Sequence, residues 1–169
     1  FAWGGPSFDL PWPPARNPWD PACFTGGSSS GSGAAVAAGL VLGCTGSDTG
    51  GSIRMPASLC GVSGFKPSYG LCSAAGVFPL APTLDHPGPM AWTVEDCAIL
   101  LQAMAGHDPQ DPASADRTLL DYRRELERPI SGLRIGFVRH FHEDDASVSD
   151  AVKRALNDAV VVFRSLGAE

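Results

Sequence analysis

The chain has 169 residues and carries 18 acidic against 12 basic side chains, a formal net charge of −6. Its length fits one ordinary domain, and an apolar fraction of 44% excludes disorder by composition. The acidic balance excludes a nucleic-acid-binding surface, and the longest apolar stretch, residues 33–44, is too short to span a bilayer. We therefore expect no direct contact with nucleic acid and no membrane insertion.

The first 25 residues contain six prolines and three tryptophans, which excludes a helix or a central strand there. We expect this segment to be extended over a surface and anchored by its aromatic rings. Residues 26–33 (GGSSSGSG) have the composition of a flexible linker. However, residues 34–42 are small and apolar, which predicts a helix buried on every side, and a linker does not normally lead into such a helix.

The middle of the chain predicts short elements separated by loops. A strand over 41–45 is followed by a second loop of small residues, 46–52, and by a helix over 53–59 in which Pro56 is tolerated near the first turn. Residues 62–66 predict a strand, and residues 67–92 are rich in turns.

The last third predicts more helix than strand. Thr93 is a candidate N-cap for a helix over 94–105 that Gly106 closes, and a short helix is expected around 119–127. A strand over 133–138 and an amphipathic helix over 149–166 follow. Alternating strands and helices predict an α/β layered fold.

Both ends of the sequence indicate an internal piece of a longer chain. Residue 1 is Phe, and the first five residues lack the charged and apolar regions of a signal peptide. The last predicted helix ends only three residues before the chain does.

Cysteine and histidine usage argues against a metal centre. The five cysteines are odd in number and form no CxxC pair, so we expect reduced, buried thiols in a cytoplasmic protein; they are Cys23, Cys44, Cys60, Cys72 and Cys97. His140 and His142 lie beside three acidic residues, but a solvated polar loop is the better interpretation. We expect no metal and no cofactor.

The two Gly/Ser loops are candidates for a nest of converging backbone N–H groups. A phosphate site of the P-loop type needs a lysine at a fixed place, and neither loop has one. An oxyanion site needs an adjacent nucleophile, and Ser52 directly follows Gly50-Gly51. A nucleophile elbow centred on Ser29 is disfavoured, because a Pro-rich segment rather than a strand precedes it.

Residues 26–52 (GGSSSGSGAAVAAGLVLGCTGSDTGGS) resemble the signature of the amidase signature hydrolases. The likeness continues through Ile53-Arg54-Met55-Pro56-Ala57, Cys60-Gly61, Gly64-Phe65-Lys66-Pro67, Leu84-Asp85-His86-Pro87-Gly88-Pro89 and Thr93-Val94-Glu95-Asp96. It is firm over about residues 17–108 and looser over 109–169. The resemblance implies an incomplete part of one amidase domain, with a central mixed sheet flanked by helices.

The resemblance also implies a Ser–Ser–Lys triad that forms an acyl-enzyme. Ser52 would be the nucleophile and Ser28, after a cis peptide bond, the bridging serine. The oxyanion hole would consist of the backbone N–H groups of Thr49, Gly50, Gly51 and Ser52. Arg54 is expected to form a buried ion pair with Asp48 that braces this loop. His86 is expected to be a structural hydrogen-bonding residue.

The triad lysine is the departure from the family. Only Lys66 and Lys153 are present, and Lys66 matches a structural Lys-Pro pair of the family. We therefore expect the lysine to lie upstream of this chain, which would be inactive alone.

The expected function is hydrolysis of a small-molecule amide, with homodimer formation possible. The alternatives are the A subunit of a tRNA-dependent amidotransferase or a non-catalytic amidase-like binding protein. Leu71-Cys72, where such A subunits tend to have Arg-Val, favours a stand-alone amidase.

Overall fold

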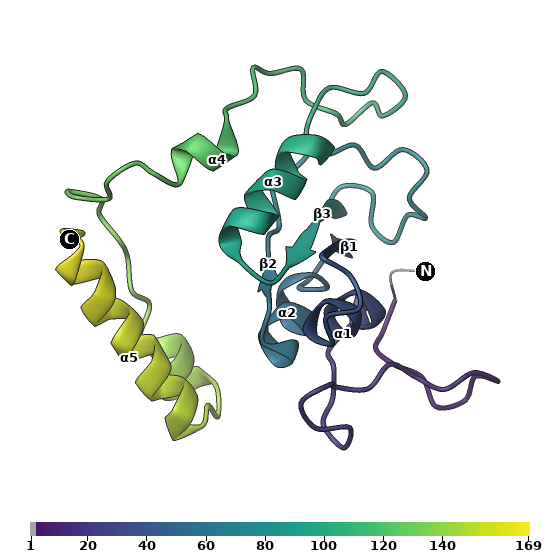
Figure 1. The fold of residues 1–169 in the computed structure, drawn as a ribbon, viewed down its shortest axis with the longest axis horizontal. Coiled ribbons are helices and arrows are strands. Elements are labelled where there is room, and N and C mark those ends of the chain that lie inside the picture. The colour runs from purple at the N-terminus through teal and green to yellow at the C-terminus, as the bar shows by residue number, and fades with distance from the viewer. Residues whose placement is uncertain (1–2) are drawn as a thin grey trace. The chain divides into compact units, whose positions relative to one another are not determined.

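A computed structural model describes residues 3–169, which form two compact units. The first is Phe1–Leu126 and the second is Glu127–Glu169; each is described by itself (Figure 1). The first unit combines helices with a small sheet, so the expected α/β class is confirmed.

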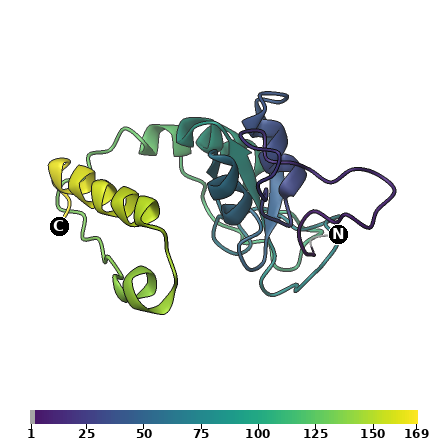
Figure 2. The ribbon, with the colours of Figure 1, turned by 90° about the horizontal axis from the view of Figure 1, so that it is seen from below.

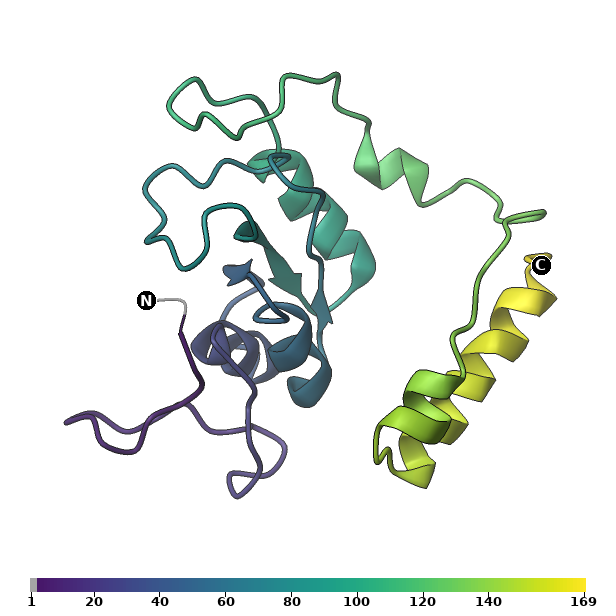
Figure 3. The same cartoon turned by 180° about the vertical axis from the view of Figure 1, so that it is seen from behind.

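The sheet of the first unit has three strands in the order β1-β3-β2, and both neighbouring pairs are antiparallel. Strand β1 spans Gly43–Asp48 and β2 spans Ser63–Gly64, so both predicted strands exist with shifted ends. Strand β3, His86–Ala91, lies between them (Figure 3). At the end of β1, Asp48 pairs with His86.

Strand β3 lies within residues 67–92, which the sequence predicts to be rich in turns. Prolines such as Pro87 and Pro89 ordinarily argue against a central strand. The structure shows why both prolines are tolerated. Phe65 N–H donates to Pro89 O at 3.0 Å, so the backbone of residue 89 faces β2. Backbone groups alternate in direction along a strand, so residue 87 faces the same side and the N–H groups at 86, 88 and 90 face β1. Neither proline therefore removes a donor from the longer ladder.

Two helices pack beside this sheet. Helix α1 spans Ser30–Ala37, so it begins and ends several residues before the predicted helix. The expectation that it is buried on every side is wrong, because Gly31 of α1 is exposed and Ala34 and Ala35 are half-buried. Leu40 and Leu42, which belong to the predicted range but lie beyond the end of α1, are 77% and 93% exposed. Helix α2, Arg54–Cys60, matches its prediction closely. Ile53, Ala57 and Met90 form the core between α2 and β3.

Helix α3, Val94–Met104, begins as the sequence predicts. The Thr93 side chain accepts a hydrogen bond from Asp96 N–H at 3.0 Å, which caps the first turn. Leu101 of α3 packs with Leu71 and Cys72 in a second apolar cluster. Helix α4 is only four residues long, Tyr122–Glu125, and is shorter than predicted.

Residues 3–25, the described part of the Pro-rich segment, contain no regular element, as expected. Trp19 anchors it by donating from Nε1 to Cys60 O at 2.8 Å and by meeting Trp92 edge-on. Trp19 is itself 65% exposed, so its contacts rather than its burial make it an anchor; the rings of Trp3 and Trp12 form no hydrogen bond or ring contact with another described residue. One ring rather than three holds the segment.

The second unit contains the predicted amphipathic helix as α5, Asp150–Ser165, and the Ser149 side chain caps it (Figure 2). The predicted strand over 133–138 is absent. Ile135 N–H donates to Glu169 O, Glu169 N–H donates to Leu133 O, and Gly132 N–H donates to Gly167 O, whereas Leu133 N–H donates to Ile130 O in a turn. These few bonds do not form a strand ladder. A short π-helix, η1 (Phe141–Asp145), replaces the expected solvated loop, and it buries His142.

The expectation that all five cysteines are buried is wrong for two of them. All five cysteines are free, but Cys23 is exposed and Cys44 is half-buried. Burial raises the pKa of the Cys72 thiol to about 11. Within residues 3–169, no helix has the length and apolarity needed to cross a membrane, and no cluster of side chains has the composition of a metal site.

Candidate active site

The two Gly/Ser loops meet at the start of α1. The backbone N–H of Ser29 donates to the carbonyl of Ser52 at 3.3 Å, which brings Ser28 into the neighbourhood of Ser52. The Gly27–Ser28 peptide bond is cis, as the resemblance implies. Ser28 and Ser52 are both half-buried, and their hydroxyls have no hydrogen-bond partner in the described part of the chain.

Glycine is required where the first loop enters this site. Gly26 has φ +78°, and a Cβ there would lie 2.9 Å from the Pro56 backbone in α2. A Cβ at Gly27 would collide with the backbone of Gly4 and Gly5. The Gly-Gly pair therefore lets the chain pass between α2 and the N-terminal segment, so the loop is packed rather than a free linker.

Ser29 has a structural role. Its Oγ donates to Ser47 O at 3.3 Å and accepts from Ser47 N–H at 3.2 Å. This hydroxyl therefore joins the start of α1 to β1, which agrees with the absence of a nucleophile elbow at this serine.

Asp48 organises the second loop from inside. Its carboxylate accepts from the backbone N–H groups of Gly51 at 2.7 Å, Ile53 at 3.2 Å and Arg54 at 3.3 Å. The Arg54 guanidinium adds two bonds of 2.9 Å from Nε and Nη2. Burial opposes ionisation of this carboxyl, but Arg54 and the three N–H groups outweigh it and hold the pKa of Asp48 well below its usual range.

The predicted ion pair is thus confirmed, with one difference. The Asp48 side chain is fully buried, whereas the Arg54 side chain is 55% exposed. The acid is the interior member, and the arginine closes the loop from the solvent side.

The backbone N–H groups of this loop fall into two sets. Gly51 N–H is engaged by Asp48. The N–H groups of Thr49, Gly50 and Ser52 donate to no acceptor among the residues that the structure describes. Gly51 has φ +126°, a conformation that L side chains rarely adopt, so the turn requires glycine. Backbone donors without a partner beside a serine hydroxyl are the kind of group that an oxyanion hole uses.

A second acidic side chain, which sequence reasoning gave no role, contacts this loop from the other side. The Thr49 hydroxyl donates to Oδ1 of Asp85, a carboxylate that also accepts from Leu80 and Ala81 N–H. The next residue, His86, has Nδ1 3.2 Å from Asp48 O, in agreement with its expected structural role. The only signal for Asp85 in the sequence is its place in the Leu84–Pro89 motif.

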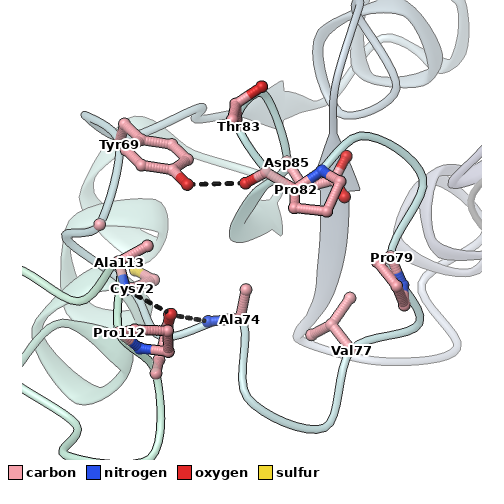
Figure 4. Close-up of a pocket in the computed structure, with 12 residues that line it drawn as sticks. Tyr69, Cys72, Ala74, Val77, Pro79, Pro82, Thr83, Asp85, Pro112 and Ala113 are labelled. Carbon is pink, nitrogen blue, oxygen red and sulfur yellow. Dashed lines mark hydrogen bonds between the residues drawn. The ribbon is translucent and has the colours of Figure 1, made fainter.

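A cavity of about 330 Å³ lies on the far side of Asp85 (Figure 4). Its wall is mostly apolar, with Val77 and Pro79 facing it, and Tyr69 donates to Pro82 O at 2.6 Å along one edge. Asp111 is the other carboxylate of the wall, and it accepts from the N–H groups of Ala74 and Ala113.

The side chain of Lys66, the lysine of the first unit, bonds to its own neighbour in the sequence and not to Ser28 or Ser52. Its Nζ donates to Pro67 O at 2.9 Å. This contact agrees with a structural role for the Lys-Pro pair.

A family model described as Amidase matches residues 8–169. The chain belongs to the amidase family. A curated relative from Nitrosospira multiformis, the A subunit of glutamyl-tRNA(Gln) amidotransferase, is 47% identical over the whole chain, which covers 35% of that relative. The chain therefore spans about a third of the length of the curated amidase relatives that it matches.

Solved structures of the family agree with the fold. The A subunit of glutamyl-tRNA(Gln) amidotransferase from Thermotoga maritima matches with a TM-score of 0.92 and 40% identity, over 99% of this chain and 36% of that one. The peptide amidase of Stenotrophomonas maltophilia matches with a TM-score of 0.81 and 37% identity, over 90% of this chain and 31% of that one. The matched amidases therefore include both amidotransferase subunits and hydrolases.

Proposed function

We propose that this chain carries the nucleophilic part of an amide-hydrolysing site, with Ser52 as the nucleophile and Ser28 as the proton relay. Ser52 Oγ attacks the amide carbon and forms an ester bond, while its proton passes to Ser28 and the Ser28 proton passes to a basic lysine. Neither lysine of residues 1–169 is assigned as the base, because Lys66 is bound to Pro67 O and Lys153 belongs to the second unit; the base is a lysine of the full-length protein outside this range.

The negative charge formed on the carbonyl oxygen is stabilised by the backbone N–H groups of Thr49, Gly50 and Ser52. Gly51, which the family resemblance also assigns to the oxyanion hole, contributes instead by holding the turn, since its N–H is bound to Asp48. Collapse of the tetrahedral intermediate breaks the C–N bond, and the leaving nitrogen takes a proton from the lysine–serine relay. Water then attacks the ester and regenerates Ser52.

One observation carries this proposal: the hydrogen bond from Ser29 N–H to Ser52 O. It joins two loops that are more than twenty residues apart in the sequence, at Ser52 and at the residue that directly follows Ser28. The unpaired N–H groups beside Ser52 support the same chemistry.

A second candidate is the A subunit of a tRNA-dependent amidotransferase, in which the released ammonia passes to another acceptor. The curated relatives that carry this name are 46–49% identical to the chain. Peptide amidase and aryl acylamidase structures are 34–37% identical. This difference favours the amidotransferase, whereas Leu71-Cys72 favours the hydrolase; both begin with the same attack on a small-molecule amide.

The experiment compares Ser52→Ala, Ser28→Ala and the control Ser30→Ala in the full-length protein. Hydrolysis of glutamine and of an aryl amide is measured, together with labelling by a fluorophosphonate. We expect Ser52→Ala to abolish labelling and both activities, and Ser28→Ala to lower kcat by about 10³-fold or more. Ser30 has no hydrogen bond from its hydroxyl in the described residues, so its variant should keep its activity. Substantial activity of Ser52→Ala would overturn the proposal.

A further inference from the structure

We infer that Asp85 is a positioning residue that fixes the oxyanion loop through the hydroxyl of Thr49. The inference deepens the proposed function and rests on it. Asp85 touches neither Ser28 nor Ser52 in the structure, so its effect on the reaction is indirect.

The Asp85 carboxylate is itself held in place before it reaches Thr49. It is 7% exposed and accepts from Leu80 N–H at 2.9 Å and from Ala81 N–H at 3.0 Å and 3.1 Å. A carboxylate fixed by two backbone donors has little freedom to follow a moving partner. Thr49 is therefore bound to a stationary point.

The direction of the hydrogen bond is set by charge. Burial works against ionisation of Asp85, but hydrogen bonds from Thr49, Leu80 and Ala81 and the proximity of His86 lower the pKa of its carboxyl. An ionised carboxylate only accepts, so the Thr49 hydroxyl must donate to it. The Thr49 side chain thereby adopts one orientation.

The Thr49–Asp85 hydrogen bond acts on the part of the loop that the Asp48 carboxylate does not bind. Asp48 holds Gly51, Ile53 and Arg54 but makes no contact with Thr49 or Gly50 N–H. Fixing the Thr49 side chain restricts its backbone, which sets the direction of the N–H groups of Thr49 and Gly50, two of the three in this loop that lack a partner in the described structure. Asp48 and Asp85 therefore hold opposite halves of the same turn.

Asp111 provides a matched comparison within the molecule. It lines the same cavity and likewise accepts two backbone N–H groups, from Ala74 at 2.8 Å and Ala113 at 2.9 Å. It makes no contact with residues 48–52 in the described structure. A loss specific to Asp85 therefore reports the Thr49 contact and not damage to the cavity wall.

The test measures kcat, KM and fluorophosphonate labelling of Ser52 in the full-length protein, for Asp85→Asn, Thr49→Val, their double variant and the control Asp111→Asn. We expect each single variant at the Thr49 contact to lower kcat and the labelling rate by about tenfold, with KM changed by less than about twofold. The double variant should be no worse than the poorer single variant, since both remove one interaction. Thr49→Ser, which keeps the hydroxyl, should lose less than Thr49→Val.

Multiplicative losses in the double variant, a change in KM alone, or equal kcat for Asp85→Asn and Asp111→Asn would each overturn the inference. If Asp85→Asn does not fold, Thr49→Val carries the test, because it leaves the backbone contacts of the carboxylate intact; unchanged kcat then overturns it. Activity retained by Ser52→Ala in the same assay identifies failure of the proposed function instead.

Discussion

At the scale of single residues, Asp48 holds more of the candidate site than any other described side chain. One buried carboxylate receives three backbone N–H groups and a two-point contact from Arg54. Removing such an acceptor leaves several donors without partners, and this loss exceeds the net value of any one bond.

Asp48→Asn should lower the free energy of unfolding by about 2–3 kcal/mol, because an amide offers one acceptor oxygen and turns a donor toward the remaining N–H groups. Urea denaturation monitored by circular dichroism measures the change. Arg123→Gln is the control, since the Arg123–Glu95 pair is exposed and should contribute no more than about 0.5 kcal/mol. Equal losses in the two variants would contradict the central role of Asp48.

Stability should also fall in acid. The folded-state pKa values of Asp48 and Asp85 are both below their unfolded values, so each group stabilises the fold above an unfolded pKa of about 4 and loses this contribution as the pH falls further. Urea midpoints of the wild type measured between neutral pH and about pH 3 should therefore decline below about pH 5. Asp48→Asn should show a shallower decline; an identical slope would argue against its low pKa.

Features formed by residues close together in the sequence are predicted better than contacts between distant residues. The Asp48–Arg54 pair and the cis Gly27–Ser28 bond are both confirmed. The Asp85–Thr49 contact is absent from the prediction because 36 residues separate the partners, and only the pairing of β1 with β3 brings them together.

At the scale of elements, helices with a clear cap are predicted well. Helices α3 and α5 begin where Thr93 and Ser149 cap them. Helix α1 and strand β3 are predicted poorly for opposite reasons. The start of α1 is rich in glycine and serine, which disfavour a helix, and tertiary packing overrides this preference. Strand β3 contains prolines, which disfavour a central strand, but its N–H donors are needed on one side only.

Strand β3 leads to a test of close packing. A Cβ at Gly88 would collide with Phe65 O and lie 2.9 Å from Pro67 Cδ, so Gly88→Ala should destabilise the chain by about 1–3 kcal/mol. Gly31→Ala is the matched control in helix α1, where nothing lies within 4 Å, and should stabilise by about 0.5–1 kcal/mol. Thermal denaturation of both variants measures these shifts. A neutral Gly88→Ala would show that β2 and β3 separate easily.

At the scale of the whole molecule, the resemblance predicts more than any local pattern does. The family is confirmed, and so is an α/β fold that matches its members at about a third of their length. Local periodicity alone predicts a strand over 133–138 that the structure lacks. Strands depend on partners, and the few backbone hydrogen bonds that residues 132–135 form with Gly167 and Glu169 do not provide a ladder.

The 169-residue chain alone should be inactive. Its candidate nucleophile and N–H groups are present, but in the proposed mechanism the base lies outside the chain, and loss of one triad member costs about 10³-fold or more. The check is amide hydrolysis by this chain and by the full-length protein at equal concentration. Turnover by the short chain close to that of the long one, abolished by Lys66→Ala, would identify Lys66 as the base and contradict this expectation.

The two prolines of β3 also determine how far the sheet extends. Pro87 and Pro89 lack N–H groups on the side facing β2, and β2 pairs with β3 at only two residues. A foreign strand that approached this side beyond Gly64 would find carbonyl oxygens but no donors. Open strand edges commonly recruit other chains into aggregates, and proline is one of the means by which proteins prevent this. The residues that conceal β3 in the sequence therefore also protect it from unwanted association.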